Sequence, residues 1–193
     1  MKLRTLTPLF LLVCVPACQV PVLEHFENAE AQEASWAAHR YANVFATDFP
    51  GEIAIFPILD ETSSQLIPMA SIRVALRSGL LKRGFTPLAD DFVDLKAQAQ
   101  PASTFQLEHA AAAEGRIHSW DSTHAPEGRL AFDLEISFFD SQGKVLGNFR
   151  WQDQIKLTSA EYSASSPELR ERLLLGHMMD LVLAGLPDPP PLD

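Results

Sequence analysis

The chain has 193 residues, 47% of them hydrophobic, and a formal net charge of −10. This length can bury the core of one ordinary domain but is short for two. The acidic balance argues against nucleic acid as a partner and against attraction to anionic lipid head groups, because both carry the same sign of charge.

The amino terminus has the order of a secretion signal. Two basic residues precede the apolar run Leu6–Val15, which is about 10 residues long, whereas a membrane-spanning helix needs roughly 20. The run leads into Val15-Pro16-Ala17-Cys18, which resembles the lipobox of bacterial lipoproteins. We therefore predict that residues 1–17 are removed and that Cys18 is diacylated and becomes the mature amino terminus. Ordinary secretion after cleavage near Ala17 is the alternative.

The lipidated cysteine would make the membrane a partner through acyl chains alone. Each buried methylene contributes about 0.8 kcal/mol, so two or three chains hold a protein stably. An aspartate after the cysteine commonly retains lipoproteins at the inner membrane, and here that position is Gln19. The predicted location is therefore the periplasmic face of the outer membrane.

The mature chain is more acidic than the precursor. Cleavage removes Lys2 and Arg4, which leaves 13 of the 15 Lys and Arg residues against all 25 Asp and Glu residues, a formal charge of −12. Of the two cysteines, Cys14 lies in the signal and Cys18 would carry lipid. The mature protein is thus predicted to fold without a disulfide, despite an oxidising compartment.

Residues 18–49 are predicted to be a tether that becomes a helix over Glu24–Tyr41, because the composition favours helix. Pro50-Gly51 is a strong turn signal. A single domain is predicted over residues 50–186, followed by a Pro-rich tail, 187–193, that would project as a stiff extended end.

The first half of the domain predicts strand, helix, strand and short helix. Glu52–Ile58 is apolar on both faces, as in a central strand, and residues 60–64 form a polar loop. A helix over 65–83 would bury a stripe and end at Gly84. An edge strand, 85–88, and a helix over 92–98 capped by Asp90 or Asp91 follow. The stripe is Ile67, Ala70, Val74 and Leu81.

The second half predicts antiparallel strands and a final helix. After a strand over 112–122, a long hairpin spans residues 129–157 around the turn Asp140–Gly143. A polar loop follows Thr158, and a helix begins at Ser166-Pro167 and stops near Gly185. The inward hairpin positions are Leu130, Phe132, Leu134, Ile136 and Phe138, then Val145, Gly147, Phe149 and Trp151. The helix face is Leu169, Leu173, Leu174, Met178, Leu181 and Val182.

This order predicts an α/β fold with a mixed sheet, in which an initial βαβ portion is parallel, a hairpin meander is antiparallel and the C-terminal helix packs on the sheet. Four segments carry a family resemblance: Ile53–Pro57, Leu80–Phe85, the Gly-Arg-Ile-x-x-Trp strand at 115–120, and Asp140–Leu146. Over residues 50–185 the chain resembles the periplasmic lipoproteins with a TolB amino-terminal-like fold, the group of LpoB-type synthase activators and CsgG. The resemblance implies a protein that acts through its surfaces.

Candidate chemical sites are few. His118 and His124 flank a turn and could join Asp121 in a metal site, but no tight His pair or Cys pair is present. Asp90-Asp91 could be offered as acid and base, although helix capping explains them. Trp120 and Trp151, expected on neighbouring strands, could stack on a glycan, with core packing as the alternative. The chain has no Gly-x-Ser-x-Gly elbow and no glycine-rich phosphate loop after the first strand.

We therefore predict no enzyme, no cofactor and no metal, and a protein that binds an envelope partner in cell-wall synthesis or secretion; the sequence leaves oligomerisation open. The runner-up function is an auxiliary lipoprotein of an ABC-type lipid transport system, which a neighbouring permease gene would favour. A third hypothesis, a peptidoglycan or glycan hydrolase, would need activity that depends on Asp90, Asp91 or His118.

Overall fold

One mixed sheet organises the part of the chain that the computed structural model describes, residues 49–62, 67–107 and 109–190. The predicted signal peptide, Cys18, the tether with its helix, and residues 191–193 of the tail lie outside the described residues. All described residues fall within one unit, residues 36–193.

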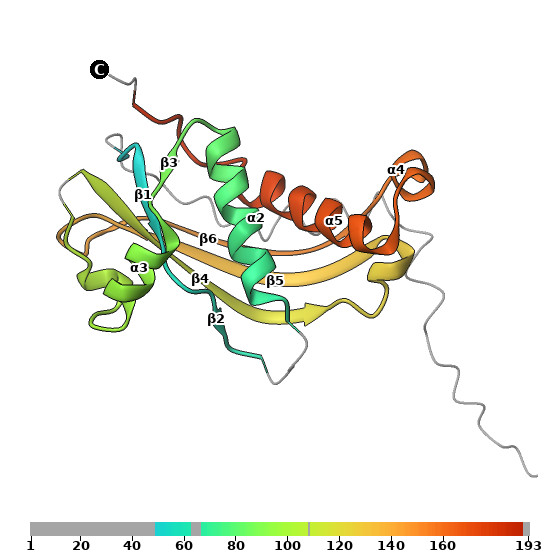
Figure 1. Ribbon diagram of the computed structural model, residues 1–193, viewed down its shortest axis with the longest axis horizontal. Coiled ribbons are helices and arrows are strands. Elements are labelled where there is room, and N and C mark those ends of the chain that lie inside the picture. Colours follow the sequence, from blue (N-terminus) through green and yellow to red (C-terminus); the bar gives the residue numbers. More distant parts are fainter. Residues whose placement is uncertain (1–48, 63–66, 108, 191–193) are drawn as a thin grey trace, which may run out of the picture. The chain divides into compact units, whose positions relative to one another are not determined.

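The sheet has six strands in the order β3-β1-β4-β5-β6, with β2 paired to β4 off this path (Figure 1). β1 runs parallel to both β3 and β4, whereas β4, β5 and β6 are antiparallel to one another. The strand bounds are β1 (Glu52–Ile55), β2 (Leu59–Asp60), β3 (Thr86–Pro87), β4 (Ala110–Asp121), β5 (Arg129–Phe139) and β6 (Val145–Lys156). This confirms the predicted α/β class with its parallel βαβ portion and its hairpin meander.

The helices cover both faces of the sheet. The long helices α2 (Met69–Lys82) and α5 (Pro167–Val182) contact each other and pack on the larger core cluster. The short helix α3 (Asp90–Ala97) packs through Val93 on a second cluster on the opposite face. The remaining turns of helix are α4 (Ser159–Ala164), η2 (Ala102–Thr104) and η3 (Ala125–Glu127).

Burial on two faces explains the apolar sequence of β1. Ile53 and Ile55 belong to the core beneath α2 and α5, while Ala54 and Phe56 belong to the cluster beneath α3. The prediction of a central strand is confirmed, although β1 ends at Ile55 and the chain then forms β2 where a loop was expected.

The alanine run of β4 forms a strand because it pairs with β1 and is buried. Ala110–Ala113 also suits a helix by propensity, but these residues pair with β1 and are at most 2% exposed. Small side chains let covering elements approach from both faces, and tertiary packing overrides helix propensity. The predicted strand is confirmed and begins two residues earlier than expected, at Ala110.

Helix α2 turns a different face to the core from the one predicted. Its fully buried residues are Ile72, Leu76 and Leu80, which recur every four positions and so share one face. Val74 and Leu81 of the predicted stripe are 57% and 56% exposed. The prediction was wrong because α2 is apolar on two faces, and spacing alone does not say which one meets the sheet.

The long hairpin is confirmed, with one irregularity. All five predicted inward residues of β5 are buried, at 2% exposure or less. In β6 the pairing shifts by one residue, since Phe138 pairs with Gly147 and Phe139 with Val145. This bulge turns Leu146 into the core and leaves Val145 54% exposed, which corrects the predicted alternation at its first position.

The C-terminal helix begins and ends close to the prediction. Ser166 caps α5 by accepting from the Leu169 amide, and Pro167 occupies its first turn. The buried face is centred on Leu174, Met178 and Val182, whereas Leu169 is 44% exposed and is not part of it. Leu175 and Met179, which were not in the predicted face, are also buried.

The described part of the tail does not project. A Cβ atom added at Gly84 would lie 3.2 Å from Pro189 Cγ, and one added at Gly51 would lie 3.5 Å from Pro190 Cγ. Arg83 donates to the Leu186 carbonyl and approaches Asp188. Residues 186–190 therefore follow the domain surface, because prolines pack against positions that lack a side chain.

The segment after Thr158 was predicted to be a polar loop, but it contains the short helix α4. A reciprocal capping box stabilises the start of this helix. Thr158 accepts from the Glu161 amide while the Glu161 carboxylate accepts from Thr158. The Thr158 side-chain hydroxyl, the Thr158 amide and His177 together lower the pKa of Glu161 from 4.5 to about 2.

We expect stability to fall with acid through this carboxylate. The folded Glu161 is harder to protonate than the unfolded one, so its contribution is complete above about pH 4.5 and is lost as the pH falls toward about 2. Urea unfolding at pH 3 and pH 5 should show a larger difference for the wild type than for Glu161→Gln. Equal differences in the two proteins would contradict the assignment.

Candidate functional site

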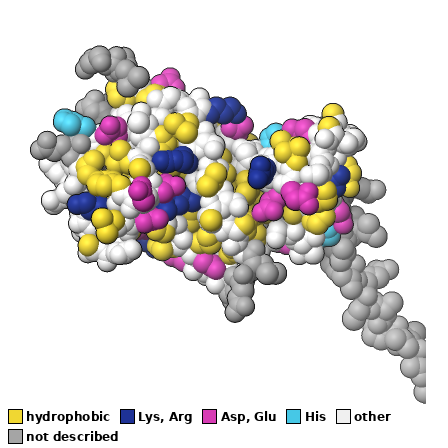
Figure 2. Space-filling model, viewed as in Figure 1, with side chains coloured by type: hydrophobic (Ala, Val, Ile, Leu, Met, Phe, Trp, Pro, Cys, Tyr) yellow, Lys and Arg dark blue, Asp and Glu magenta, His cyan; other side chains and the backbone are white. Residues whose placement is uncertain are grey.

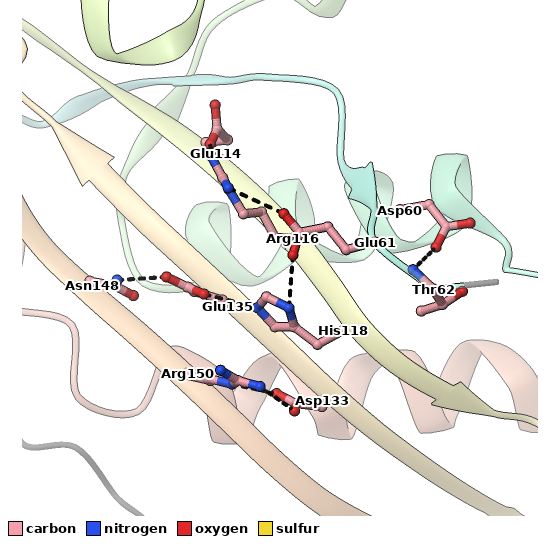
Figure 3. A network of polar contacts seen from close by, with 10 residues as sticks. All are labelled: Asp60, Glu61, Thr62, Glu114, Arg116, His118, Asp133, Glu135, Asn148 and Arg150. Carbon is pink, nitrogen blue, oxygen red and sulfur yellow. Dashed lines mark hydrogen bonds and ion pairs between the residues drawn. The ribbon is translucent and has the colours of Figure 1, made fainter. Parts of the chain in front are cut away.

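A band of charged side chains lies on the sheet face opposite α2 and α5 (Figure 3). It is formed where alternate residues of β4, β5 and β6 point away from the main core. We call it the charged face, and its members are Glu61, Glu114, Arg116, His118, Asp133, Glu135, Asn148 and Arg150.

His118 is at the centre of this face, at an irregularity in β4. The pairing with β5 passes from Ile117–Leu134 directly to Ser119–Asp133, so His118 is the extra residue of a bulge. Its Nδ1 lies 2.9 Å from Glu61 Oε2 and its Nε2 lies 2.9 Å from Glu135 Oε2. A ring placed between two carboxylates can donate to both only when both nitrogens carry a proton.

The contacts of the Glu135 carboxylate lower its pKa. Burial alone would raise its pKa, but hydrogen bonds from Asn148 and His118, with the charge of His118, outweigh it and lower the pKa below 4.5. Asn148 Nδ2 donates to Glu135 Oε1 over 2.7 Å. The residue is thereby kept ionised and is not a proton donor near neutral pH.

Two arginines neutralise the other carboxylates. Arg116 donates to Glu114 over 2.6 Å and to Glu61 over 3.2 Å, and its hydrogen bond with Glu114 is the largest cause of its raised pKa. Arg150 binds Asp133 through two nitrogens, at 3.0 and 2.9 Å. The Asp133 side chain is only 8% exposed, so this pairing compensates a buried charge.

The charged groups of the charged face are thus paired with one another, whereas the buried Asn148 Oδ1 has no hydrogen-bond partner in the described structure. The His118 and Arg116 contacts of Glu61 also fasten the end of β2 to β4. No group of three or more His, Cys, Asp or Glu residues within the described ranges could hold a metal ion. The face has the composition of a structural network, and its carboxylates are already partnered.

Removing the His118 ring should destabilise the fold moderately. We expect His118→Ala to lower the free energy of unfolding by about 1–2 kcal/mol, because it leaves Glu135, a partly buried carboxylate, without one of its donors. His124→Ala is the matched control, since that ring is half exposed and forms its ion pair with the exposed Glu127. We expect a change within about 0.5 kcal/mol for the control. Equal losses in chemical denaturation would show that the contacts of His118 add nothing.

The other predicted site residues do not come together. Asp90 faces Arg77 and Arg73, at 3.4 and 3.8 Å, and Asp91 accepts only from the neighbouring Phe92 amide among the described residues. The residue at the cap of α3 is Ala89, so the predicted aspartate cap was wrong. His118 and His124 have different carboxylate partners.

The arginine partners of α3 are Arg73 and Arg77 of α2, which also contact the parallel part of the sheet. Arg73 donates to the Ile55 carbonyl and to Asp94, and Arg77 donates to the Leu88 carbonyl. These two side chains fasten the carboxyl ends of β1 and β3, where open α/β sheets commonly bind ligands. In this protein the side chains of Arg73 and Arg77 already occupy the carbonyl groups at that position.

The two tryptophans lie on either side of β5. Trp120 of β4 pairs with Phe132 of β5, and Trp151 of β6 pairs with Leu134 of β5. The two tryptophans were predicted on neighbouring strands, and this was wrong because β5 lies between β4 and β6. Both pack against the main core. Trp120 also lines a cavity of about 280 Å³, and its indole nitrogen is buried without a hydrogen-bond partner in the described structure.

A groove of about 650 Å³ lies between α2 and α5. Its α2 side includes Val74, and its α5 side includes Gly176 and Met179. Figure 2 shows hydrophobic side chains exposed over α2 on this side of the molecule. The other lining residues are Ala70, Ser71, Ala75, Ser78, Gly79, Lys82, Arg172, Leu175 and Asp180. Sequence reasoning missed the groove, although the second apolar face of α2 was a signal for it.

No family model matches this chain, and no curated protein matches it. Among solved structures it is similar to a dodecamer of a single-residue variant of PelC from Paraburkholderia phytofirmans, with 14% identity and a TM-score of 0.50, covering 76% of this chain and 96% of that one. A second PelC dodecamer structure from the same organism has 12% identity, a TM-score of 0.47, and coverage of 77% and 96%.

The lipoprotein GNA1162 from Neisseria meningitidis has 14% identity and a TM-score of 0.45, covering 72% of this chain and all of that one. At such identities a structural likeness extends to the fold and not to the activity. The chain thus shares the fold of PelC. Its resemblance to the TolB amino-terminal-like group stays a prediction.

Proposed function

We propose that this protein is a lipid-anchored accessory factor of the bacterial envelope. In this proposal Cys18 holds the protein at the outer membrane, and the folded domain binds another protein and catalyses no reaction. The observation that carries the proposal is the pairing of a lipobox with a domain that has an apolar groove on its surface, between α2 and α5. Anchor and groove together suit a protein that holds a binding surface at a membrane.

The electrostatics of the domain support a binding role. The side chains that the sequence offers as catalytic have other partners: Asp90 pairs with Arg77, His118 pairs with Glu135, and Asp91 accepts from the Phe92 amide. No helix in the described ranges has the length and hydropathy to cross a membrane. Attachment then depends on the acyl chains in this proposal, because an acidic domain gains nothing from anionic lipid.

The fold that the chain shares with PelC bears on how it would act. The PelC structure is a dodecamer, so this fold is compatible with assembly through its own surfaces. A protein that acts by contact can use such an assembly to present many copies of one surface.

Replacing Cys18 with alanine tests the anchor. We expect the variant to move from the membrane fraction to the soluble periplasmic fraction, because an acidic domain is not attracted to anionic lipid head groups. A Ser163→Ala variant, exposed and distant in sequence, should fractionate like the wild type. If Cys18→Ala stayed as membrane-bound as the wild type, the anchor would be refuted.

Cross-linking in whole cells followed by purification of the protein tests the binding role. We expect one or more envelope proteins to be recovered with it. Recovery of the bait alone from envelopes solubilised under several conditions would count against an accessory function.

A further inference from the structure

Helix α2 carries an apolar face that the described fold leaves uncovered. Its inner face, with Ile72, Leu76 and Leu80, is fully buried. The outer face exposes more than half of Val74 and of Leu81, which lie seven positions apart and hence on one side of the helix. Such exposed apolar positions beside a groove mark a contact surface more often than an isolated one does.

Gly176 lines this groove, and no neighbouring atom within the domain requires a glycine at this position. Glycine is unfavourable in the middle of a helix, so an internal glycine usually avoids a clash. At Gly79 that reason holds, since a Cβ there would lie 2.8 Å from Leu183 Cδ1. At Gly176 an added Cβ would meet nothing within 4 Å. The missing side chain instead leaves room for something that enters from outside.

One cationic side chain that lines the groove, Arg172, forms no ion pair with another described residue. Lys82 of α2 is bound to Asp180 of α5 over 2.7 Å, and both residues line the groove. Arg172 lines the groove and has no ion pair with any described residue. In a chain with a formal charge of −10, such a cation beside an apolar groove suits an occupant that carries an apolar side chain next to a carboxylate.

The short helix α3 of the same chain has that chemistry. Phe92 is 39% exposed and Leu95 is 67% exposed, on the side opposite the buried Val93. Asp91 lies four positions before Leu95 and so shares this side of the helix. Its neighbours Asp90 and Asp94 are engaged by arginines of α2, whereas Asp91 has no ion pair among the described residues.

We propose that the α2–α5 groove of one copy receives α3 of a second copy, with Phe92 and Leu95 against Val74, Gly176 and Met179, and with Asp91 facing Arg172. The proposal rests on the proposed binding function and names its partner. Because the two surfaces are different, the contact is head-to-tail, and each added copy leaves one groove and one α3 free. Copies therefore continue to add, into a ring if the rotation between copies closes and into an open filament if it does not.

Paired variants of the full chain test this contact, each carrying Cys18→Ser so that acyl chains do not associate. Gly176→Leu fills the groove, and Phe92→Ser with Leu95→Ser removes the apolar part of α3. Leu169→Ser is the control, because Leu169 is exposed but lies outside the groove and α3. Sedimentation velocity measures the assembly, and urea unfolding checks that each variant is folded.

We expect the starting chain and the control to associate with rising concentration, and each variant to associate at least about tenfold more weakly, the effect of roughly 1.4 kcal/mol. Mixing the two variants should then restore one contact and give a one-to-one heterodimer, since one retains the groove and the other retains α3. Failure of the folded mixture to form that heterodimer would overturn the proposal, as would a starting chain that stays monomeric.

Other results separate this contact from the proposed function. A groove that pairs with another groove would leave the α3 variant fully associated, and this would overturn the role of α3. A monomeric chain that is still recovered in the membrane fraction with another envelope protein would refute self-assembly and leave the accessory function standing.

Discussion

Phe138→Ala should lower the free energy of unfolding by about 3–5 kcal/mol, the range for truncation of a buried phenylalanine. Phe138 is fully buried on β5 and makes edge-to-face contacts with Phe49 and Phe149, at centroid distances of 5.2 and 6.1 Å. The loss combines transfer of the ring to water with a cavity that β5, held by strands on both sides, cannot close.

Chemical denaturation of the mature protein measures this loss, with Phe92→Ala as the matched control. Phe92 is 39% exposed on α3, so we expect its replacement to change the free energy of unfolding by less than about 1 kcal/mol. An unchanged slope against denaturant would show that the variants unfold between the same states. A loss below about 1 kcal/mol for Phe138→Ala would mean that the aromatic cluster does not form the core.

Gly143→Ala should lower the free energy of unfolding by more than the strain of the turn alone, because it also creates a backbone clash. Gly143 has φ of +78°, in the turn between β5 and β6, and the left-handed conformation costs an alanine about 1–2 kcal/mol. A Cβ there would also lie 2.0 Å from the carbonyl oxygen of Ser103. Because that oxygen belongs to the backbone of η2, relief of the clash requires the turn and η2 to separate, which adds to the loss.

Gly176→Ala is the matched comparison for Gly143→Ala, because it adds the same methyl group at a position where a Cβ would meet nothing within 4 Å. We expect it to stabilise the isolated domain by about 1 kcal/mol, the difference between glycine and alanine inside a helix. Opposite signs for the two variants in thermal or urea unfolding would support both assignments. A stabilised Gly143→Ala would show that the turn has another conformation in solution.

Short-range patterns explain the parts of the fold that could be predicted. The alternation along β5 reports one buried face, and Ser166-Pro167 at the start of α5 satisfies free amides of the first turn. Both signals depend on residues within a few positions of each other. The bulge that exposes Val145 was not predictable in this way, since it depends on which residues of β6 meet β5.

The charged face could not be predicted because its contacts join distant parts of the sequence. Glu61 follows β2, His118 lies on β4 and Glu135 lies on β5. The sequence suggested His118 as a metal ligand with His124 and Asp121, or as a residue of a hydrolase site with Asp90 or Asp91. The structure instead places it between two glutamates that come from other parts of the sheet.

The α/β class, the hairpin and the C-terminal helix follow from sequence patterns alone, and the prediction for Cys18, which lies outside the described residues, has no other source. The three-dimensional packing was needed to learn which face of α2 is buried, that β4 begins two residues earlier than predicted, at Ala110, and that a groove remains between α2 and α5. Local propensity and periodicity act over a few residues, whereas burial depends on which distant elements cover a given face.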